Sequence, residues 1–242
     1  MLKLISPGVF GEAFGEGTPN VLALHGWGRD RRDFSRLQQG LSGFALDLPG
    51  FGSSPAPPSA WSTADYARVV LPVLGMLSPP RLVVGHSFGG RVAVQLADLS
   101  EAVDRLVLVG TPLLRVGVPP RPNRRYAAIR WLAARRAIPH AVLERARVRY
   151  GSEDYVRAQG VMREVLVRAV NESYETQLRN VKCETILVSG EFDDAVPPEI
   201  TRRAARYVSA SRVVIVEGAG HLIDDEIVNA LRPFLNGGAS SV

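Results

Sequence analysis

Gly85-His86-Ser87-Phe88-Gly89-Gly90 stands directly after the apolar run 82–84 and directly before the helix-like stretch 91–97. A serine between two glycines at a strand-to-helix junction can sit on a tight turn that exposes its hydroxyl, because neither flank carries a Cβ that would block the backbone approach. A G-x-S-x-G match alone also fits an ordinary turn in a chain with 23 glycines. The strand before it and the helix after it favour the nucleophile turn, so Ser87 is the candidate nucleophile.

Two further polar side chains follow apolar runs later in the chain. A serine nucleophile requires a base, and the base requires a group that orients it. His221 follows the run 213–216 through a glycine-rich turn, and Asp193 follows the run 186–188. Because the carboxyl ends of parallel strands meet at one edge of a sheet, we expect Ser87, Asp193 and His221 to converge there.

The segment Leu24-His25-Gly26-Trp27-Gly28 ends another apolar run and forms a glycine-flanked loop. Acyl transfer develops negative charge on a carbonyl oxygen, and each backbone N–H that stabilises this charge is typically worth about two to four kcal/mol. The loop can supply one such donor, and Phe88, the residue after the nucleophile, can supply the other. We expect His25 to be structural rather than a base.

These segments together resemble those of small serine hydrolases with the α/β-hydrolase fold, and the resemblance covers nearly the whole chain. It implies an α/β fold with a mostly parallel sheet flanked by helices, in which Ser87 is the nucleophile, His221 the general base and Asp193 its orienting acid. It also implies that the backbone N–H groups of Trp27 and Phe88 form the oxyanion hole. A serine at position 87 argues against the haloalkane dehalogenases and epoxide hydrolases of this fold, which carry an aspartate there. The matching segments are 25–28, Asp47-Leu48-Pro49-Gly50-Phe51-Gly52, 85–89, 190–197 and 218–221.

Short apolar runs alternate with helical stretches along the chain, which predicts a mostly parallel sheet with helices on both faces. Residues 1–110 and 181–242 are expected to form the hydrolase core, and 111–180 a helical cap inserted between two of its strands. The first long helix opens with the capping pattern Ser62-Thr63-Ala64-Asp65. Strands are expected near 2–5, 9–14, 21–25, 43–48, 81–86, 104–110, 185–190 and 212–217. Helices are expected near 63–77, 88–99, 198–208 and 224–235.

The expected cap is the most basic part of the chain. Residues 111–180 hold 14 arginines against six acidic residues, whereas the whole chain has a formal charge of only +5. The part from Arg121 to Arg136 holds six arginines and no acid. Apolar side chains between them predict an apolar helical stripe beside a basic one, and these are Tyr126, Ile129, Trp131 and Leu132.

Three interpretations of this basic cap stay open. It is a solvated surface in a chain where 27 of the 29 basic residues are arginine, or it attracts an acidic substrate or acyl carrier, or it binds a membrane surface or nucleic acid. The segments 25–28 and 47–52 are similar to those of the pimeloyl-carrier-protein methyl ester esterases, which also use a basic cap. This resemblance favours the second interpretation, and no nucleic-acid motif supports the third.

The length and composition of the chain limit the classes of protein to which it can belong. A chain of 242 residues with 46% hydrophobic residues can bury one full core. The single cysteine, Cys183, cannot form an internal disulfide, and no metal-ligand spacing surrounds it. No signal-peptide pattern opens the sequence and no run approaches eighteen apolar residues, so the expected location is cytoplasmic.

The sequence therefore predicts a serine-dependent hydrolase of carboxylic esters that forms an acyl-enzyme and needs no cofactor or metal. Its expected partner is a small-molecule ester, anionic or carrier-bound, with no nucleic acid and no membrane span, and the oligomeric state stays open. The alternatives are hydrolysis of carrier-bound esters or thioesters, hydrolysis of a carbon–carbon bond, and a non-catalytic binding role on the same fold.

Overall fold

The computed structural model describes residues 1–115, 124–150 and 152–235 of the chain. Eight strands form one sheet in the order β1-β2-β4-β3-β5-β6-β7-β8. The strands from β3 to β8 run parallel to one another, while β1 and β2 pair antiparallel at one edge. This is the mostly parallel sheet that the alternating pattern predicts. The strands are β1 (Leu2–Ser6), β2 (Val9–Phe14), β3 (Val21–Leu24), β4 (Gly43–Asp47), β5 (Leu82–His86), β6 (Arg105–Val109), β7 (Glu184–Gly190) and β8 (Ser211–Val216).

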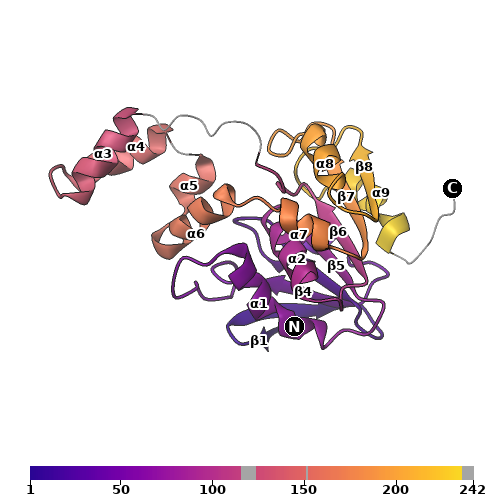
Figure 1. The fold of residues 1–242 in the computed structure, drawn as a ribbon. Coiled ribbons are helices and arrows are strands. Elements are labelled where there is room, and N and C mark those ends of the chain that lie inside the picture. The colour runs from indigo at the N-terminus through magenta and orange to yellow at the C-terminus, as the bar shows by residue number, and fades with distance from the viewer. Residues whose placement is uncertain (116–123, 151, 236–242) are drawn as a thin grey trace.

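Alternate residues of the central strands fill two apolar cores, one on each face of the sheet. In β3, Leu22 and Leu24 belong to one core, and Val21 and Ala23 belong to the other. Central strands buried on both faces therefore appear as unbroken apolar runs in the sequence. Helices α1 (Thr63–Leu74), α2 (Phe88–Leu99), α7 (Glu175–Asn180) and α8 (Pro198–Ala205) contribute to the first core, and the 3-10 helix η1 (Arg31–Phe34) and α9 (Asp225–Leu235) to the second (Figure 1).

Helix α1 begins with the predicted capping box. The Ser62 hydroxyl accepts the Asp65 backbone N–H at 3.2 Å, and the Asp65 carboxylate accepts the Ser62 N–H at 2.8 Å. Both α1 and α8 end three residues before the expected positions 77 and 208. In each case the chain continues in a turn whose N–H groups donate to the carbonyl three residues back. The apolar side-chain pattern of the helix therefore continues for one turn beyond the end of the α-helix.

The segment between β6 and β7 is helical, as predicted, and its described residues contain no strand. Helix α6 packs on the body of the molecule, because Val165 and Ala169 lie in the first core. Helix α3 has no buried side chain, and Figure 1 shows α3 and α4 projecting away from the sheet. Besides α7, the helices of this segment are α3 (Arg124–Ala134), α4 (His140–Tyr150), α5 (Glu153–Arg157) and α6 (Gly160–Asn171).

The apolar stripe predicted for α3 is partly wrong. Tyr126, Ile129 and Leu132 are half-buried, but Trp131 is 55% exposed. The guanidinium of Arg135 lies over the Trp131 ring at 3.7 Å from its centroid, so a cation covers the indole instead of an apolar neighbour. None of the described helices is long and apolar enough to cross a lipid bilayer.

Candidate active site

Ser87 lies at the junction of β5 and α2 in a strained backbone conformation, with φ 49° and ψ −108°. Left-handed φ values are costly for a residue with a Cβ and persist only where the surrounding structure enforces them. The glycines on either side explain how this happens. A Cβ at Gly89 would lie 2.0 Å from the Leu24 carbonyl oxygen, and one at Gly85 would lie 2.5 Å from the Gly90 Cα. Glycine therefore lets α2 begin directly against β3 and β5, with Ser87 partly exposed on the turn.

The structure brings Ser87, His221 and Asp193 into one hydrogen-bonded chain. His221 Nε2 lies 3.1 Å from Ser87 Oγ, and His221 Nδ1 lies 2.8 Å from Asp193 Oδ2. The three residues follow β5, β8 and β7, so they meet at the carboxyl edge of the parallel sheet. The geometry fits an imidazole that donates from Nδ1 to the carboxylate and faces the serine hydroxyl with Nε2.

The structure also distinguishes Asp193 from the acid next to it. Asp193 is buried, and its Oδ1 accepts the backbone N–H groups of Ala195 at 3.0 Å and Val196 at 2.7 Å. Both of its carboxylate oxygens are therefore occupied, and the side chain has one orientation. Asp194 is exposed.

The loop after β3 lies against the first turn of α2. The Gly89 N–H donates to the His25 carbonyl at 3.0 Å, and the rings of Trp27 and Phe88 pack edge to face at 5.2 Å. Among the hydrogen bonds of the described residues, neither the Trp27 N–H nor the Phe88 N–H has a protein acceptor. Both N–H groups are thus available for a ligand oxygen, and one of them belongs to the residue directly after Ser87.

His25 is structural in this loop, as expected. It is fully buried, its Nδ1 lies 2.7 Å from the Gly26 carbonyl oxygen, and its Nε2 accepts the Leu48 N–H at 3.0 Å. Nε2 is therefore unprotonated and Nδ1 is the donor, which leaves no ring nitrogen for catalysis. Burial lowers the pKa of His25, so the ring stays neutral. It ties the loop after β3 to the turn after β4.

The turn after β4 is held by the buried carboxylate of Asp47. This carboxylate accepts the Arg31 backbone N–H, the Arg31 guanidinium and the Ser53 N–H, each at 2.8 Å. Helix α6 lies against the same turn, since a Cβ at Gly50 would lie 2.2 Å from the Met162 sulfur. The inserted segment and the turn thus meet near the active site.

Two buried groups next to the triad were not anticipated from the sequence. His86 Nδ1 lies 2.7 Å from Asp33 Oδ2, and His86 Nε2 lies 2.9 Å from the His221 carbonyl oxygen. The only sequence signal was the position of His86 before Ser87. Asp33 lies in a short 3-10 helix that has no distinctive pattern, so its role depends on tertiary structure.

Asp154 is a third unanticipated residue, and it comes from the inserted segment. Ser152 caps α5 by accepting the Tyr155 N–H at 3.3 Å, which places Asp154 in the first turn. Partial desolvation raises the pKa of the Asp154 carboxyl although the residue is exposed, and the charges of Arg157 and, more weakly, His221 oppose that rise. An acid of α5 therefore lies within electrostatic reach of the triad.

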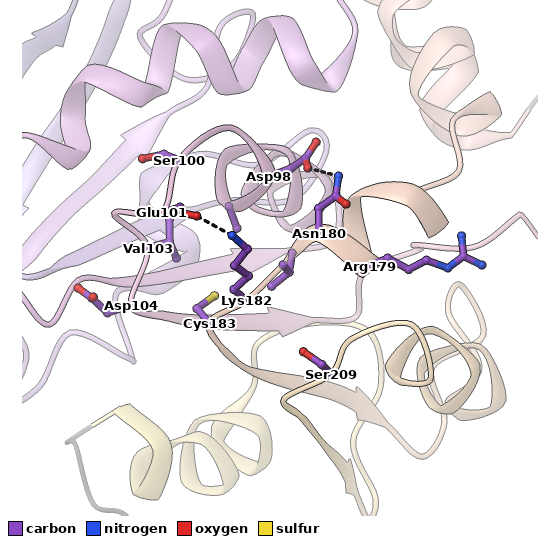
Figure 2. Close-up of a pocket in the computed structure, with 12 residues that line it drawn as sticks. Asp98, Ser100, Glu101, Val103, Asp104, Arg179, Asn180, Lys182, Cys183 and Ser209 are labelled. Carbon is purple, nitrogen blue, oxygen red and sulfur yellow. Dashed lines mark hydrogen bonds and ion pairs between the residues drawn. The ribbon is translucent and has the colours of Figure 1, made fainter.

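A cavity of about 690 Å³ lies at the other end of the sheet, beside the amino ends of β6, β7 and β8 (Figure 2). Its charged lining groups pair with neighbours: Glu101 with Lys182 at 2.7 Å, and Asp98 with the amide of Asn180 at 2.8 Å. We interpret it as a surface hollow that plays no part in the triad's chemistry. In the part of the chain that the structure describes, no three His, Cys, Asp or Glu side chains form a metal-binding cluster.

The chain belongs to the alpha/beta hydrolase family, whose family model matches residues 21–229. The resemblance inferred from the sequence is thereby confirmed. A solved esterase from Thermogutta terrifontis superposes with a TM-score of 0.66 at 24% identity, covering 94% of this chain and 92% of that one. That likeness shows the shared fold.

Two curated relatives differ in how much of the chain they match. The pimeloyl-[acyl-carrier protein] methyl ester esterase of Chromobacterium violaceum is 37% identical over 110 residues, which is 43% of this chain and 41% of that protein. The magnesium-chelatase 30 kDa subunit of Rhodobacter capsulatus is 25% identical over 250 aligned residues, 88% of this chain and 84% of that protein. Other relatives, 38% identical, are matched over only 28% of their length.

Proposed function

We propose that this chain is a serine hydrolase of carboxylic esters. The observation that carries the proposal is the hydrogen-bonded chain from Asp193 through His221 to Ser87, with separations of 2.8 and 3.1 Å. In this arrangement a base contacts the nucleophile and a buried carboxylate contacts the base. The strained turn at Ser87 and the two available N–H groups beside it support the same reaction class.

Acylation uses the three side chains of this hydrogen-bonded chain and the two backbone N–H groups. Ser87 Oγ attacks the ester carbonyl carbon while its proton moves to His221 Nε2, and Asp193 stabilises the imidazolium that forms. The carbonyl oxygen becomes an oxyanion that accepts hydrogen bonds from the Trp27 and Phe88 N–H groups. The intermediate then collapses as His221 gives the proton to the leaving alcohol oxygen, which leaves the acyl group on Ser87.

Deacylation repeats these steps with water. His221 takes a proton from a water molecule, whose oxygen attacks the acyl carbon, and the second oxyanion occupies the same pair of N–H groups. Collapse of this intermediate breaks the bond to Ser87 Oγ, which recovers its proton from His221. The products are an alcohol and a carboxylic acid, and no step calls for a cofactor.

The segment 111–180 is proposed as the cap that selects the substrate, on a core of residues 1–110 and 181–242. One contact between the segment and the core supports this role, since Met162 of α6 lies against the turn at Gly50. We also propose that the reaction takes place in the cytoplasm.

A substrate that carries negative charge, free or bound to an acyl carrier, is the more specific form of this proposal. The inserted helices border a cavity of about 920 Å³ whose lining includes four arginines and two glutamates, Glu164 and Glu172, so its charged side chains carry a net positive charge. Arginine suits carboxylate and phosphate groups because its guanidinium presents several donors in one plane. The local similarity to the pimeloyl-carrier-protein ester esterase supports the same substrate class. The four arginines are Arg130, Arg147, Arg163 and Arg168.

A role without hydrolysis is the second candidate, because the magnesium-chelatase 30 kDa subunit is similar along most of the chain. The two candidates differ in whether Ser87 turns over an ester. The test is a panel of chromogenic esters graded in acyl length and charge, assayed with wild type and Ser87→Ala. We expect Ser87→Ala to lower kcat by about 10⁴ to 10⁶ while circular dichroism stays unchanged. A variant that keeps more than about a tenth of the wild-type rate would remove Ser87 from the mechanism.

A further inference from the structure

A second pairing of a histidine with an aspartate lies behind the triad, and the proposed reaction does not use it. His86 and Asp33 are each 1% exposed and lie 2.7 Å apart. Burying such a pair costs desolvation free energy that a well-packed apolar pair would not, so the pair is a poor choice for stability alone. Its position directly before Ser87 points to a role in the active site.

The pair contacts two elements that the reaction depends on. His86 Nε2 lies 2.9 Å from the backbone carbonyl oxygen of His221, and the two imidazole rings are 5.2 Å apart. Asp33 Oδ2 accepts the Gly26 N–H at 3.3 Å, while Asp33 Oδ1 accepts the guanidinium of Arg29. One buried pair therefore touches both the backbone of the base and the loop that carries the Trp27 N–H.

The hydrogen-bond partners define where the protons are. The His221 carbonyl oxygen can only accept, so His86 Nε2 must carry a hydrogen. Although burial favours the neutral acid, the hydrogen bond and charge of His86 and the charge of Arg29 hold the pKa of Asp33 below its usual value. One further hydrogen lies between His86 Nδ1 and Asp33 Oδ2, which are 2.7 Å apart, while Nε2 is the donor to the His221 carbonyl oxygen.

Gly26 shows how closely the loop rests on this ring. A Cβ at Gly26 would lie 2.9 Å from His86 Nδ1, closer than real contacts allow. The backbone of the loop is thus in direct contact with the imidazole, and a displacement of His86 would move the loop as well.

We propose that His86, held by Asp33, is a positioning residue that fixes the His221 backbone and the loop at Gly26 relative to Ser87. Its kinetic consequence rests on the proposed esterase function. A displacement of about 1 Å in a catalytic group can cost about 100-fold in rate. Loss of the hydrogen bond to His221 therefore lowers kcat, while KM changes little because substrate does not touch His86.

Two substitutions at position 86 separate the two contacts. A glutamine amide reaches the place of Nε2 and keeps a donor for the His221 carbonyl, whereas an asparagine amide reaches only the place of Nδ1 and keeps a donor for Asp33. We expect His86→Asn to lower kcat about 100-fold with KM changed by less than about threefold, and His86→Gln to stay within about tenfold of the wild-type kcat. Leu231→Ala, at a buried position of α9, is the matched control that lowers stability without lowering kcat.

Crystal structures of the two variants provide a readout that does not depend on turnover. We expect the separation of His221 Nε2 and Ser87 Oγ to stay near 3.1 Å in His86→Gln and to exceed hydrogen-bonding distance in His86→Asn. Equal kcat values in the two variants, or an unmoved His221 in His86→Asn, would overturn the positioning role. Ester turnover that survives Ser87→Ala would instead overturn the proposed function, and the crystallographic test would still decide the role of His86.

Discussion

The sheet and the inserted helices of this molecule differ in burial and in charge. The strands around Ser87 are buried on both faces, and each candidate catalytic group is tied down by neighbours: Asp193 by two backbone N–H groups, His221 by His86. No side chain of helix α3 is fully buried. Residues 111–180 also carry 14 arginines, while the rest of the chain is weakly acidic.

We infer from this difference that the sheet positions the catalytic groups and that the inserted helices recognise the substrate. Catalysis requires groups held within a fraction of an ångström, and only packed backbone and buried hydrogen bonds provide this. Recognition of a charged substrate requires only a favourable field over several ångströms, which exposed arginines provide. Substitutions around the sheet should thus change kcat or stability strongly, and substitutions on α3 should act weakly and in proportion to substrate charge.

The greatest loss of activity is predicted for a substitution of the orienting acid, Asp193. Asp193→Asn should lower kcat about 10⁴-fold, because an amide that donates to Nδ1 favours the wrong tautomer of His221. Asp194→Asn is the matched control at an exposed neighbour, and it should change kcat by less than about threefold. Steady-state kinetics on a neutral chromogenic ester measure both. If Asp194→Asn were the more damaging variant, the assignment of the acid would be wrong.

The next effect is on stability and compares two aromatic side chains. Phe34 of η1 is 1% exposed in the second core, so Phe34→Ala should lower the free energy of unfolding by about 3–5 kcal/mol. Trp131 of α3 is 55% exposed and contacts Arg135, so Trp131→Ala should cost about 1 kcal/mol or less. Urea denaturation curves of the two variants measure both free energies of unfolding. Similar losses in the two variants would mean that α3 is packed as firmly as the core.

The smallest effect concerns the charge of α3 and the turn after it. Changing Arg124, Arg125, Arg135 and Arg136 to Glu should lower kcat/KM for a carboxylate-bearing ester about tenfold at low salt and leave its neutral analogue unchanged. The loss should shrink at high salt, since exposed charges are screened over about 8 Å at physiological ionic strength. Equal effects on both esters, or no effect on either, would show that this basic surface does not recruit substrate.

Most of the fold could be predicted because its signals are local. Apolar runs over β5, β6 and β7 mark strands buried on both faces, and the Ser62 capping box marks the start of α1. The ends of α1 and α8 were misplaced because a 3-10 turn continues the same side-chain pattern. The exposed position of Trp131 was missed because helical periodicity cannot show whether another element covers the stripe.

The residues of the candidate site also fall into those that local sequence signals predict and those that depend on tertiary packing. Ser87, Asp193 and His221 could be predicted to converge because each follows a strand, and parallel strands end at a common edge. Asp33 and Asp154 could not, since their proximity to His221 depends on how η1 and α5 pack on the sheet. His86 lay within the predicted motif, yet its two buried contacts come from segments 53 and 135 residues away in sequence.

Covalent labelling shows whether Ser87 is a nucleophile activated by His221. Treatment with a fluorophosphonate, followed by peptide mass spectrometry, should give a single adduct on Ser87 in wild type and none in Ser87→Ala. Labelling of His221→Ala should be slower by about 10⁴-fold or more, because the base no longer takes the serine proton. An adduct on another residue, or labelling of Ser87 at an unchanged rate without His221, would show that Ser87 is not a nucleophile activated by His221.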